Sequence, residues 1–313
     1  MVRNKSRNVP PKASAMTEAL RGLGYTAAGA LADIIDNSIS ASADQVQLLF
    51  FWDGPASRIV VVDNGQGMDD AELERAMRFG ERSPLDARTA QDLGRFGLGL
   101  KTASFSQCRR LTVASRKGGE THCLRWDLDV LAASEDGGWH LLEGPDSGVE
   151  PILGLLNATS SGTLVLWELL DRLVPSGFAE QDFLDLMDKI EGHLAMVFHR
   201  FLGGDCPRLN LTINGRPVAP WDPFLASHPA TWSSPVDRLA VDLGTIEVQC
   251  HVLPHKDRLS AHEYLSCAGP DGWTAQQGFY VYRNERLLGA CRDEKIRYVE
   301  STTYGQSAVS FGL

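Results

Sequence analysis

A helix near the N-terminus, residues 30–41 with the sequence ALADIIDNSISA, limits what this chain can fold into more than any other stretch does. Its apolar residues, among them Ile34 and Ile39, cover much of the helical surface, so part of the helix is expected to be buried. Asp33 and Asn37 are four positions apart, and their side chains therefore share one face. Two interpretations stay open: a solvated acidic stripe, or a polar patch that faces a metal ion or a ligand.

Alternating helical and strand patterns predict the α/β class, an α+β sandwich in two parts. Further helices are predicted at 14–22, 68–79, 98–106 and 178–202, and strands at 44–52, 58–63, 109–117, 121–128, 161–168, 245–255 and 277–288. Residues 208–218 have the pattern of a hairpin with Asn214–Gly215 at the turn. Residues 80–97 show no periodicity and several breakers, so they are expected to be a lid or a disordered segment. The pattern changes near residue 172, which predicts a basic arm at 1–14 and domains at 15–172 and 173–313, the second possibly incomplete.

Net charge and cysteine usage limit which binding partners and which cellular compartment are expected for this protein. The formal charge of −10 gives no general electrostatic footprint for nucleic acid, although the basic first dozen residues leave a local contact open. No apolar run approaches the roughly 20 residues that cross a bilayer, so no membrane contact is expected. The six cysteines are scattered without a C-x-x-C pair, which is typical of reduced thiols in a cytoplasmic protein.

Two further stretches carry chemistry. In RIVVVDNGQGMD, Asp63 ends a strand that reads as buried, and a carboxylate there needs a partner such as the exocyclic amine of a purine. The alternative is a tight Asn-Gly turn between a strand and a helix. In GRFGLGLKTAS, the glycines precede a helix start, where exposed N–H groups favour phosphate, and Lys101 adds a positive charge. Neither the P-loop nor the G-x-G-x-x-G fingerprint fits this stretch, because spacing and the preceding strand are wrong.

Five features follow one another in the sequence: D-x-x-D-N, D-x-G-x-G, a lid, G-x-x-G-x-G-x-K and a late S-G-T strand. In this order they resemble the GHKL superfamily, whose members share the Bergerat ATP-binding fold. The motifs LADIIDNS, DNGQGM, RFGERS and GRFGLGLKTAS most resemble those of MORC-type ATPases and their bacterial relatives. The resemblance covers residues 15–170 closely. It extends more weakly over 178–290, which are similar to the transducer domain of gyrase, MutL and MORC proteins.

The resemblance implies a role for each matching position. Asp33 would polarise the attacking water, Asn37 would bind Mg²⁺ against the phosphates, and Asp63 would read the adenine amine with support from Thr163. The remaining ATP-binding positions implied are Gly65, Gly67, Met68, Gly94, Arg95, Phe96, Gly97, Leu98, Gly99, Lys101 and Thr102. For a lysine or arginine of the second domain that reaches the γ-phosphate, the candidates are Arg283, Arg286 and Lys295.

The implied function is Mg-dependent hydrolysis of ATP to ADP and phosphate, coupled to closure of a homodimer. Many members of the family have glutamate where this chain has Asp33, a carboxylate one methylene shorter. The alternative is therefore a nucleotide-gated binding module with little or no hydrolysis.

Overall fold

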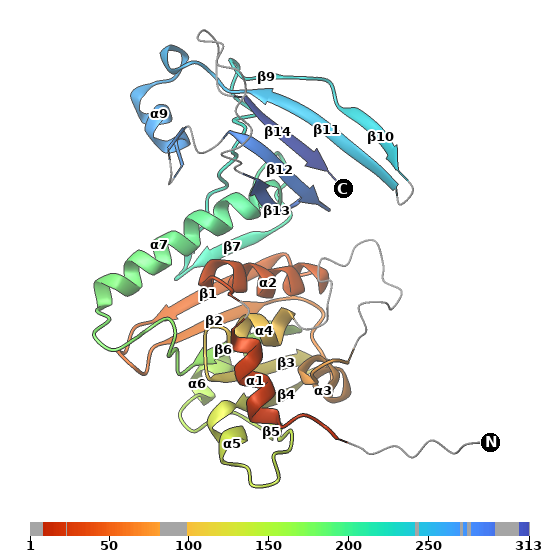
Figure 1. Cartoon of the computed structure of the whole chain (residues 1–313), viewed down its shortest axis with the longest axis vertical. Helices are drawn as coiled ribbons and strands as arrows, with labels where there is room; N and C mark the ends of the chain where they lie inside the picture. The colour runs from red at the N-terminus through yellow and green to blue at the C-terminus, as the bar shows by residue number, and fades with distance from the viewer. Residues whose placement is uncertain are drawn as a thin grey trace, which may run out of the picture. The chain divides into compact units, whose positions relative to one another are not determined.

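The computed structural model describes residues 9–22, 24–81, 99–241, 244–269, 272–273, 277–291 and 307–312 (Figure 1). Packing divides the chain into two compact units, one made of 1–187 with 212–215 and the other of 188–211 with 216–313. These units are defined by packing, and the functional boundary expected near residue 172 stays a prediction.

The first unit alternates helices and strands, as the sequence predicts. Its helices are α1 (Ala13–Arg21), α2 (Ala27–Ser40), α3 (Asp70–Met77), α4 (Gly99–Phe105), α5 (Leu128–Ala133), α6 (Glu150–Leu153) and the 3₁₀ helix η1 (Gly154–Ala158). Its strands are β1 (Gln45–Phe51), β2 (Arg58–Asp63), β3 (Arg110–Lys117), β4 (Glu120–Asp127), β5 (Leu142–Glu143) and β6 (Gly162–Glu168). The sequence analysis missed the short elements α5, β5, α6 and η1, which are too brief for a periodic signal.

The sheet of this unit places residues from distant parts of the sequence in one row. The order of its strands is β5-β4-β3-β6-β2-β1, followed by β7 (Asn210–Ile213), of which residues 212 and 213 belong to this unit; β7 and β8 (Arg216–Pro217) form the predicted hairpin. Strand β6 runs antiparallel to both of its neighbours, with Thr163 opposite Asp63 on β2 and opposite Ser115 on β3. Three polar side chains therefore meet across adjacent strands near the end of β2.

Apolar residues bury both faces of the central strands. Val60, Val62, Ala114, Leu164 and Leu166 pack in one cluster with residues of the 149–156 segment. Helix α2 packs against β2 and against α4, which itself contacts β3. A strand covered in this way reads as a continuous apolar run, which is the pattern that predicted a buried strand at 58–63. The first unit is thus an α/β sandwich.

The second unit is described here by itself. Its elements are the C-terminal part of α7 (Glu180–Val197), α8 (His199–Leu202), β9 (Trp232–Ser233), β10 (Asp237–Val241), β11 (Gly244–Val252), η2 (Lys256–Arg258), α9 (Ala261–Cys267), β12 (Gly278–Arg283), β13 (Arg286–Cys291) and β14 (Ser307–Gly312). Within the described residues, its sheet has the order β10-β11-β14-β12-β13, with β9 paired to β11. The β12–β14 pair is parallel.

Two sequence interpretations of this region are corrected. The helix expected at 178–202 is broken at Phe198, whose dihedral angles (φ −105°, ψ 13°) end α7 before α8 begins. The strand pattern at 277–288 folds as a hairpin of β12 and β13, because Asn284 and Glu285 adopt positive φ values of 49° and 69°. Positive φ at two successive residues is the geometry of a tight hairpin turn.

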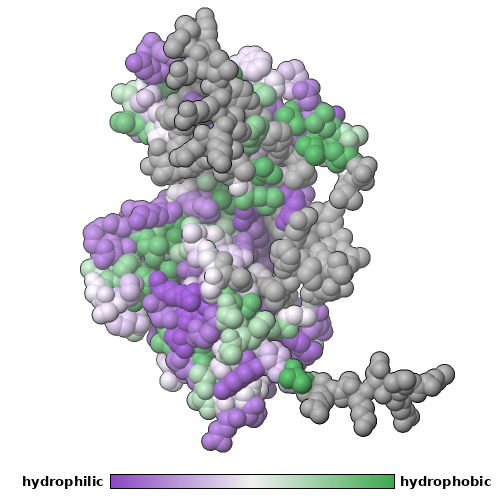
Figure 2. Space-filling view, viewed as in Figure 1, coloured by the Kyte–Doolittle hydropathy of each residue, from purple (hydrophilic) through white to green (hydrophobic). Residues whose placement is uncertain are grey.

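The core of the second unit combines aromatic rings with one buried polar contact. Phe224, Tyr280, Tyr282 and Leu287 form a buried cluster. The ring nitrogen Nε2 of His199 lies 2.9 Å from the Tyr282 hydroxyl, and burial lowers the pKa of His199 to about 4. On the surface, β10 exposes the apolar side chains of Leu239 and Val241, in the hydrophobic region that Figure 2 shows at this strand.

Candidate functional site

Asp63 ends β2 as a carboxylate that is held at both oxygens. Its Oδ2 accepts a hydrogen bond from Ser38 Oγ (2.8 Å), and its Oδ1 accepts from the backbone N–H groups of Gly65 (2.9 Å) and Thr163 (3.1 Å). The side chain is buried, which raises its pKa, while the three hydrogen bonds act in the opposite direction. A carboxylate offers about four acceptor positions, so one position is left for an incoming donor such as an amino group.

Next to this carboxylate lies a network of two hydroxyls. Ser115 Oγ accepts from the backbone N–H of Met68 (2.8 Å) and lies 2.9 Å from Thr163 Oγ1 and 3.1 Å from the carbonyl oxygen of Gly162. The structure therefore brings Asp63, Met68 and Thr163 together, and their role in nucleotide binding stays a prediction. The sequence analysis did not identify Ser38 or Ser115. Ser38 could have been found from its place beside Asn37, whereas Ser115 depends on the register of β3 against β6.

The glycines around Asp63 are required by the fold. Gly67 has φ +68°, and a Cβ there would lie 1.9 Å from the carbonyl oxygen of Arg116. A Cβ at Gly162 would lie 2.1 Å from the carbonyl oxygen of Asp63, and one at Gly65 2.9 Å from that of Ala41. The backbones that approach Gly67 and Gly162 so closely belong to the protein itself. Whether Gly65 and Gly67 also contact a nucleotide stays a prediction.

Helix α2 presents Asp33 and Asn37 at different depths. Asn37 is exposed and Asp33 is half-buried, while most neighbouring residues of the helix are buried. The helix begins at the cap residue Thr26, whose Oγ1 accepts a hydrogen bond from the Gly29 N–H at 3.1 Å. This burial pattern fits both a solvated stripe and a polar patch facing a ligand, so the ligand-facing role stays a prediction.

Tyr25 comes immediately before this cap. Its hydroxyl lies near the side chains of Asp33 and of Thr102 on α4. Burial raises the pKa of Tyr25, and the negative charge of Asp33 raises it further. The sequence analysis did not identify Tyr25, because nothing in the GYT stretch shows that its ring reaches α2 and α4.

Lys101 of α4 is deeply buried and directed at the end of α3. Its Nζ donates to the carbonyl oxygens of Ala76 (2.7 Å) and Arg78 (2.9 Å) and lies 5.9 Å from the centre of the Phe79 ring. Burial lowers the pKa of this lysine to about 8, with Glu81 opposing the shift. Carbonyls at a helix C-terminus lack partners within the helix, so this ammonium caps α3.

Part of the predicted site lies outside the described residues. This holds for the glycine-loop positions Gly94, Arg95, Phe96, Gly97 and Leu98, and for residues 82–97 of the expected lid. Gly99 begins α4, and Thr102 is buried beside Tyr25.

Of the three candidate cations for the γ-phosphate, the structure describes Arg283 and Arg286. Arg286 is buried, donates to the carbonyl oxygen of Leu287 (2.7 Å) and lies over the Phe198 ring. Arg283 ends β12, and Lys295 lies outside the described residues. The role of any of them at a phosphate stays a prediction.

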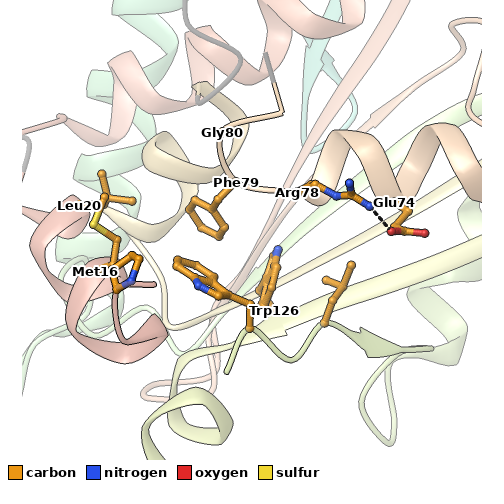
Figure 3. A pocket seen from close by; sticks show the side chains of 10 residues that line it. Met16, Leu20, Glu74, Arg78, Phe79, Gly80 and Trp126 are labelled. Atoms are coloured by element: carbon orange, nitrogen blue, oxygen red, sulfur yellow. Dashed lines mark hydrogen bonds and ion pairs between the residues drawn. The ribbon is translucent and has the colours of Figure 1, made fainter. Parts of the chain in front are cut away.

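A cavity of about 610 Å³ lies between α1, the end of α3 and β4 (Figure 3). It is lined by Pro11, Met16, Leu20, Glu74, Arg78, Phe79, Gly80, Trp126, Trp139 and Leu141. The rings of Phe79, Trp126 and Trp139 pack against one another with centroid distances of 4.9 to 6.1 Å. The predicted ATP-binding residues are not part of this lining, although the Arg78 carbonyl that binds Lys101 belongs to one of its wall residues.

The donor set suits magnesium only with help from a ligand. The described residues contain no cluster of three His, Cys, Asp or Glu side chains that could hold a metal ion. Mg²⁺ is commonly bound by one or two protein oxygens together with substrate phosphates and water, and the exposed amide of Asn37 can provide such an oxygen.

Comparison with known proteins finds a family that is similar to the part of the chain containing this site. A family model described as histidine kinase-, DNA gyrase B- and HSP90-like ATPase matches residues 25–163, a range that contains Asp33, Asn37, Asp63, Lys101 and Thr163. Residues 25–163 are therefore similar to the ATP-binding domain of GHKL ATPases, as the sequence motifs predict, and this similarity supports ATP binding.

Within this family, the chain is similar to MutL and MORC proteins. It is 34% identical over 104 residues to the DNA mismatch repair protein MutL of Rhodospirillum rubrum, which covers 33% of this chain and 16% of that protein. It is 30% identical over 111 residues to ATPase morc-1 of Caenorhabditis elegans, a match that covers 34% of this chain and 13% of that protein. A longer match to MutL of Afipia carboxidovorans is 28% identical over 275 residues and covers 85% of this chain and 40% of the relative.

The chain therefore spans well under half the length of these relatives. In the part of the chain that the structure describes, no helix has the length and apolar character that crossing a bilayer requires.

Proposed function

We propose that this chain binds Mg-ATP, hydrolyses it to ADP and phosphate, and uses the nucleotide state to close a homodimer. The observation that supports this best is the Asp63 carboxylate, held by Ser38, Gly65 and Thr163 with an acceptor position left over, inside the range that matches the ATPase family.

In this proposal Asp63 accepts a hydrogen bond from the adenine amino group, and the hydroxyl network of Ser115 and Thr163 supports it. Asn37 provides an oxygen for Mg²⁺, which would neutralise charge on the phosphates. Asp33, one helical turn earlier, accepts the proton of an attacking water and orients it. Lys101 and the loop that precedes α4 contact the phosphates, which requires the Lys101 ammonium to leave the carbonyls of Ala76 and Arg78.

Closure of a homodimer rests on similarity to this family and on two features of this chain. The first is the basic residues within positions 1–14, which have no other assigned role. The second is the apolar surface of β10, where Leu239 and Val241 are exposed. A cytoplasmic location belongs to the same proposal and rests on the scattered cysteines alone.

The second candidate is a nucleotide-gated binding module with little hydrolysis. One observation favours it: Asp33 has a side chain one methylene shorter than the usual glutamate. The two candidates share the nucleotide site and differ only in the chemical step.

Steady-state phosphate release, measured together with light scattering, separates them. We expect turnover that depends on Mg²⁺, and a change from monomer to dimer when a non-hydrolysable ATP analogue is saturating. Dimerisation without turnover would support the binding module, and neither response would refute both candidates.

A further inference from the structure

The hydroxyl of Ser115 on β3 has three hydrogen-bonding neighbours inside the first unit. Its oxygen lies 2.8 Å from the backbone nitrogen of Met68, 3.1 Å from the carbonyl oxygen of Gly162 and 2.9 Å from Thr163 Oγ1. A serine hydroxyl has one proton and two lone pairs, so three partners use its whole hydrogen-bonding capacity. Because Ser115 is fully buried, it can affect a bound ligand only through these neighbours.

The chemistry of the three neighbours determines which group donates. The Met68 N–H can only donate and the Gly162 carbonyl can only accept, so the single proton of Ser115 goes to Gly162. The contact between Ser115 and Thr163 is then a hydrogen bond only if Thr163 provides the proton. Since its proton is used in this bond, the Thr163 hydroxyl has only lone pairs to offer a ligand.

Thr163 is also tied to the Asp63 carboxylate. Its backbone N–H donates to Asp63 Oδ1 at 3.1 Å, and the two residues are partners in the register of β2 and β6. Thr163 is only half-buried, whereas Ser115 is inaccessible. The Asp63 carboxylate and the Thr163 hydroxyl are therefore two neighbouring acceptors, which suit an amino group with its two N–H bonds and oppose an oxo group, which has no proton to donate.

We propose that Ser115 is a positioning residue for Thr163, which it holds as an acceptor so that the site selects a 6-amino purine against a 6-oxo purine. This inference rests on the proposed binding of a nucleotide at Asp63. A hydroxyl that is free to rotate donates to an oxo group as well as it accepts from an amino group, and so discriminates little between them. The Ser115 contact removes the first option, and the oxo group of the wrong base is left without a hydrogen bond.

The test is Ser115→Ala, which removes the acceptor of the Thr163 proton. The probes are ADP and inosine diphosphate, whose base has an oxo group in place of the amino group, and calorimetric titration with Mg²⁺ gives the ratio of their dissociation constants. Wild type should prefer ADP, and this preference should fall about fivefold in Ser115→Ala, the scale of one neutral hydrogen bond. Ser115→Cys keeps a side chain of similar size, but a thiol is a weak donor and acceptor, so the preference should fall there too.

The matched control is Ser57→Ala, in the turn that precedes β2, at the opposite end of this strand from Asp63. Ser57 is buried, and its hydroxyl accepts from the Asp53 N–H (2.9 Å) and donates to the Gly54 carbonyl oxygen (2.7 Å). Its removal breaks bonds of the same kind away from the site, and the preference for ADP should stay unchanged.

Each other outcome contradicts the inference. An ADP preference that is absent in wild type, or unchanged in both Ser115 variants, would overturn it while leaving nucleotide binding intact. A fall in Ser115→Ala that Ser115→Cys restores, or that Ser57→Ala shows equally, would assign Ser115 to packing alone. Wild-type protein that binds neither nucleotide would refute the proposed function and, with it, the role of Ser115.

Discussion

The two ends of the candidate nucleotide site differ in how far they are already assembled. At the adenine end, Asp63 is held by three donors, all provided by neighbouring strands, turns and α2, and an acceptor position is left. At the phosphate end, Lys101 donates to two carbonyls at the end of α3. In the proposed site, the adenine end is thus preorganised, whereas Lys101 at the phosphate end has to leave its present partners before it can bind a phosphate.

The difference has a physical origin. The adenine end is built mainly on the register of β2, β3 and β6, which fixes backbone donors within the sheet. The phosphate end depends on side chains carried by the helices α2 and α4. Preorganised hydrogen bonds cost no rearrangement when a ligand binds, whereas a buried lysine has to break its existing contacts first.

The largest effect is expected at the phosphate end. Asp33→Ala should reduce turnover by about 10²- to 10⁴-fold, the usual range for removal of a general base, with Mg-ATP affinity retained. Asn37→Ala should instead weaken the Mg-dependent part of the binding. Phosphate release and calorimetric titration on both variants test this, and equal turnover in wild type and Asp33→Ala would support the binding module.

Asp63→Asn tests the adenine end. The amide presents an N–H₂ group where a charged acceptor stood, so nucleotide affinity should fall about tenfold to a hundredfold. Because the raised pKa shows that the fold disfavours the charged form, the free energy of unfolding at pH 7 should be unchanged or higher. Unchanged affinity by calorimetry would remove Asp63 from the site.

The raised pKa of the Asp63 carboxyl also predicts how the stability of the wild-type protein changes with pH. Since its pKa is higher in the folded protein, its contribution to stability is fully present at low pH and is lost as the pH rises through the folded pKa. The check is denaturant titration of wild type and Asp63→Asn between pH 3.5 and 7, a range that begins near the ordinary carboxyl pKa of about 3.9. The difference in unfolding free energy between the two proteins should grow with pH. A difference that shrinks with pH would contradict the assigned burial.

Gly67→Ala asks whether the adenine end is rigid. Its new Cβ would meet the Arg116 carbonyl at 1.9 Å, which should cost about 1–3 kcal/mol of unfolding free energy beyond the strain of a positive φ. The matched control is Gly118→Ala, because Gly118 has a similar φ of +62° and no neighbour within 4 Å. Equal destabilisation of the two variants in denaturant titrations would mean that the backbone at Arg116 moves to accommodate the new methyl group at little cost in free energy.

The smallest effect concerns Lys101. Its pKa of about 8 lies below the ordinary 10.5, so the unfolded chain binds more protons between these values and wild-type stability should rise across that interval. Lys101→Met should lack this rise, whereas Lys189→Met, at an exposed lysine of α7, should keep it. Parallel slopes for wild type and Lys101→Met would show that the ammonium is not buried in solution.

Local sequence determined the elements and one geometric relation within the site. The apolar run at 58–63 predicted a buried strand, and the spacing of Asp33 and Asn37 placed both on one face of a helix. These features follow from backbone periodicity, which depends on residues close together in the chain. The order of the motifs indicated the family to which residues 25–163 are similar, because each matched position belongs to a stretch that is continuous in sequence.

Tertiary structure alone decided which side chains meet. Strand register placed Ser115 beside Thr163, and packing of α2 against α4 brought Tyr25 to both Asp33 and Thr102. The acceptors of Lys101 lie 23 and 25 positions away from it, at the end of another helix. Strand β14 pairs between β11 and β12, although the sequence near residue 307 carries no strong signal for a strand. Contacts of this kind depend on packing across the whole fold, which no local period or turn residue encodes.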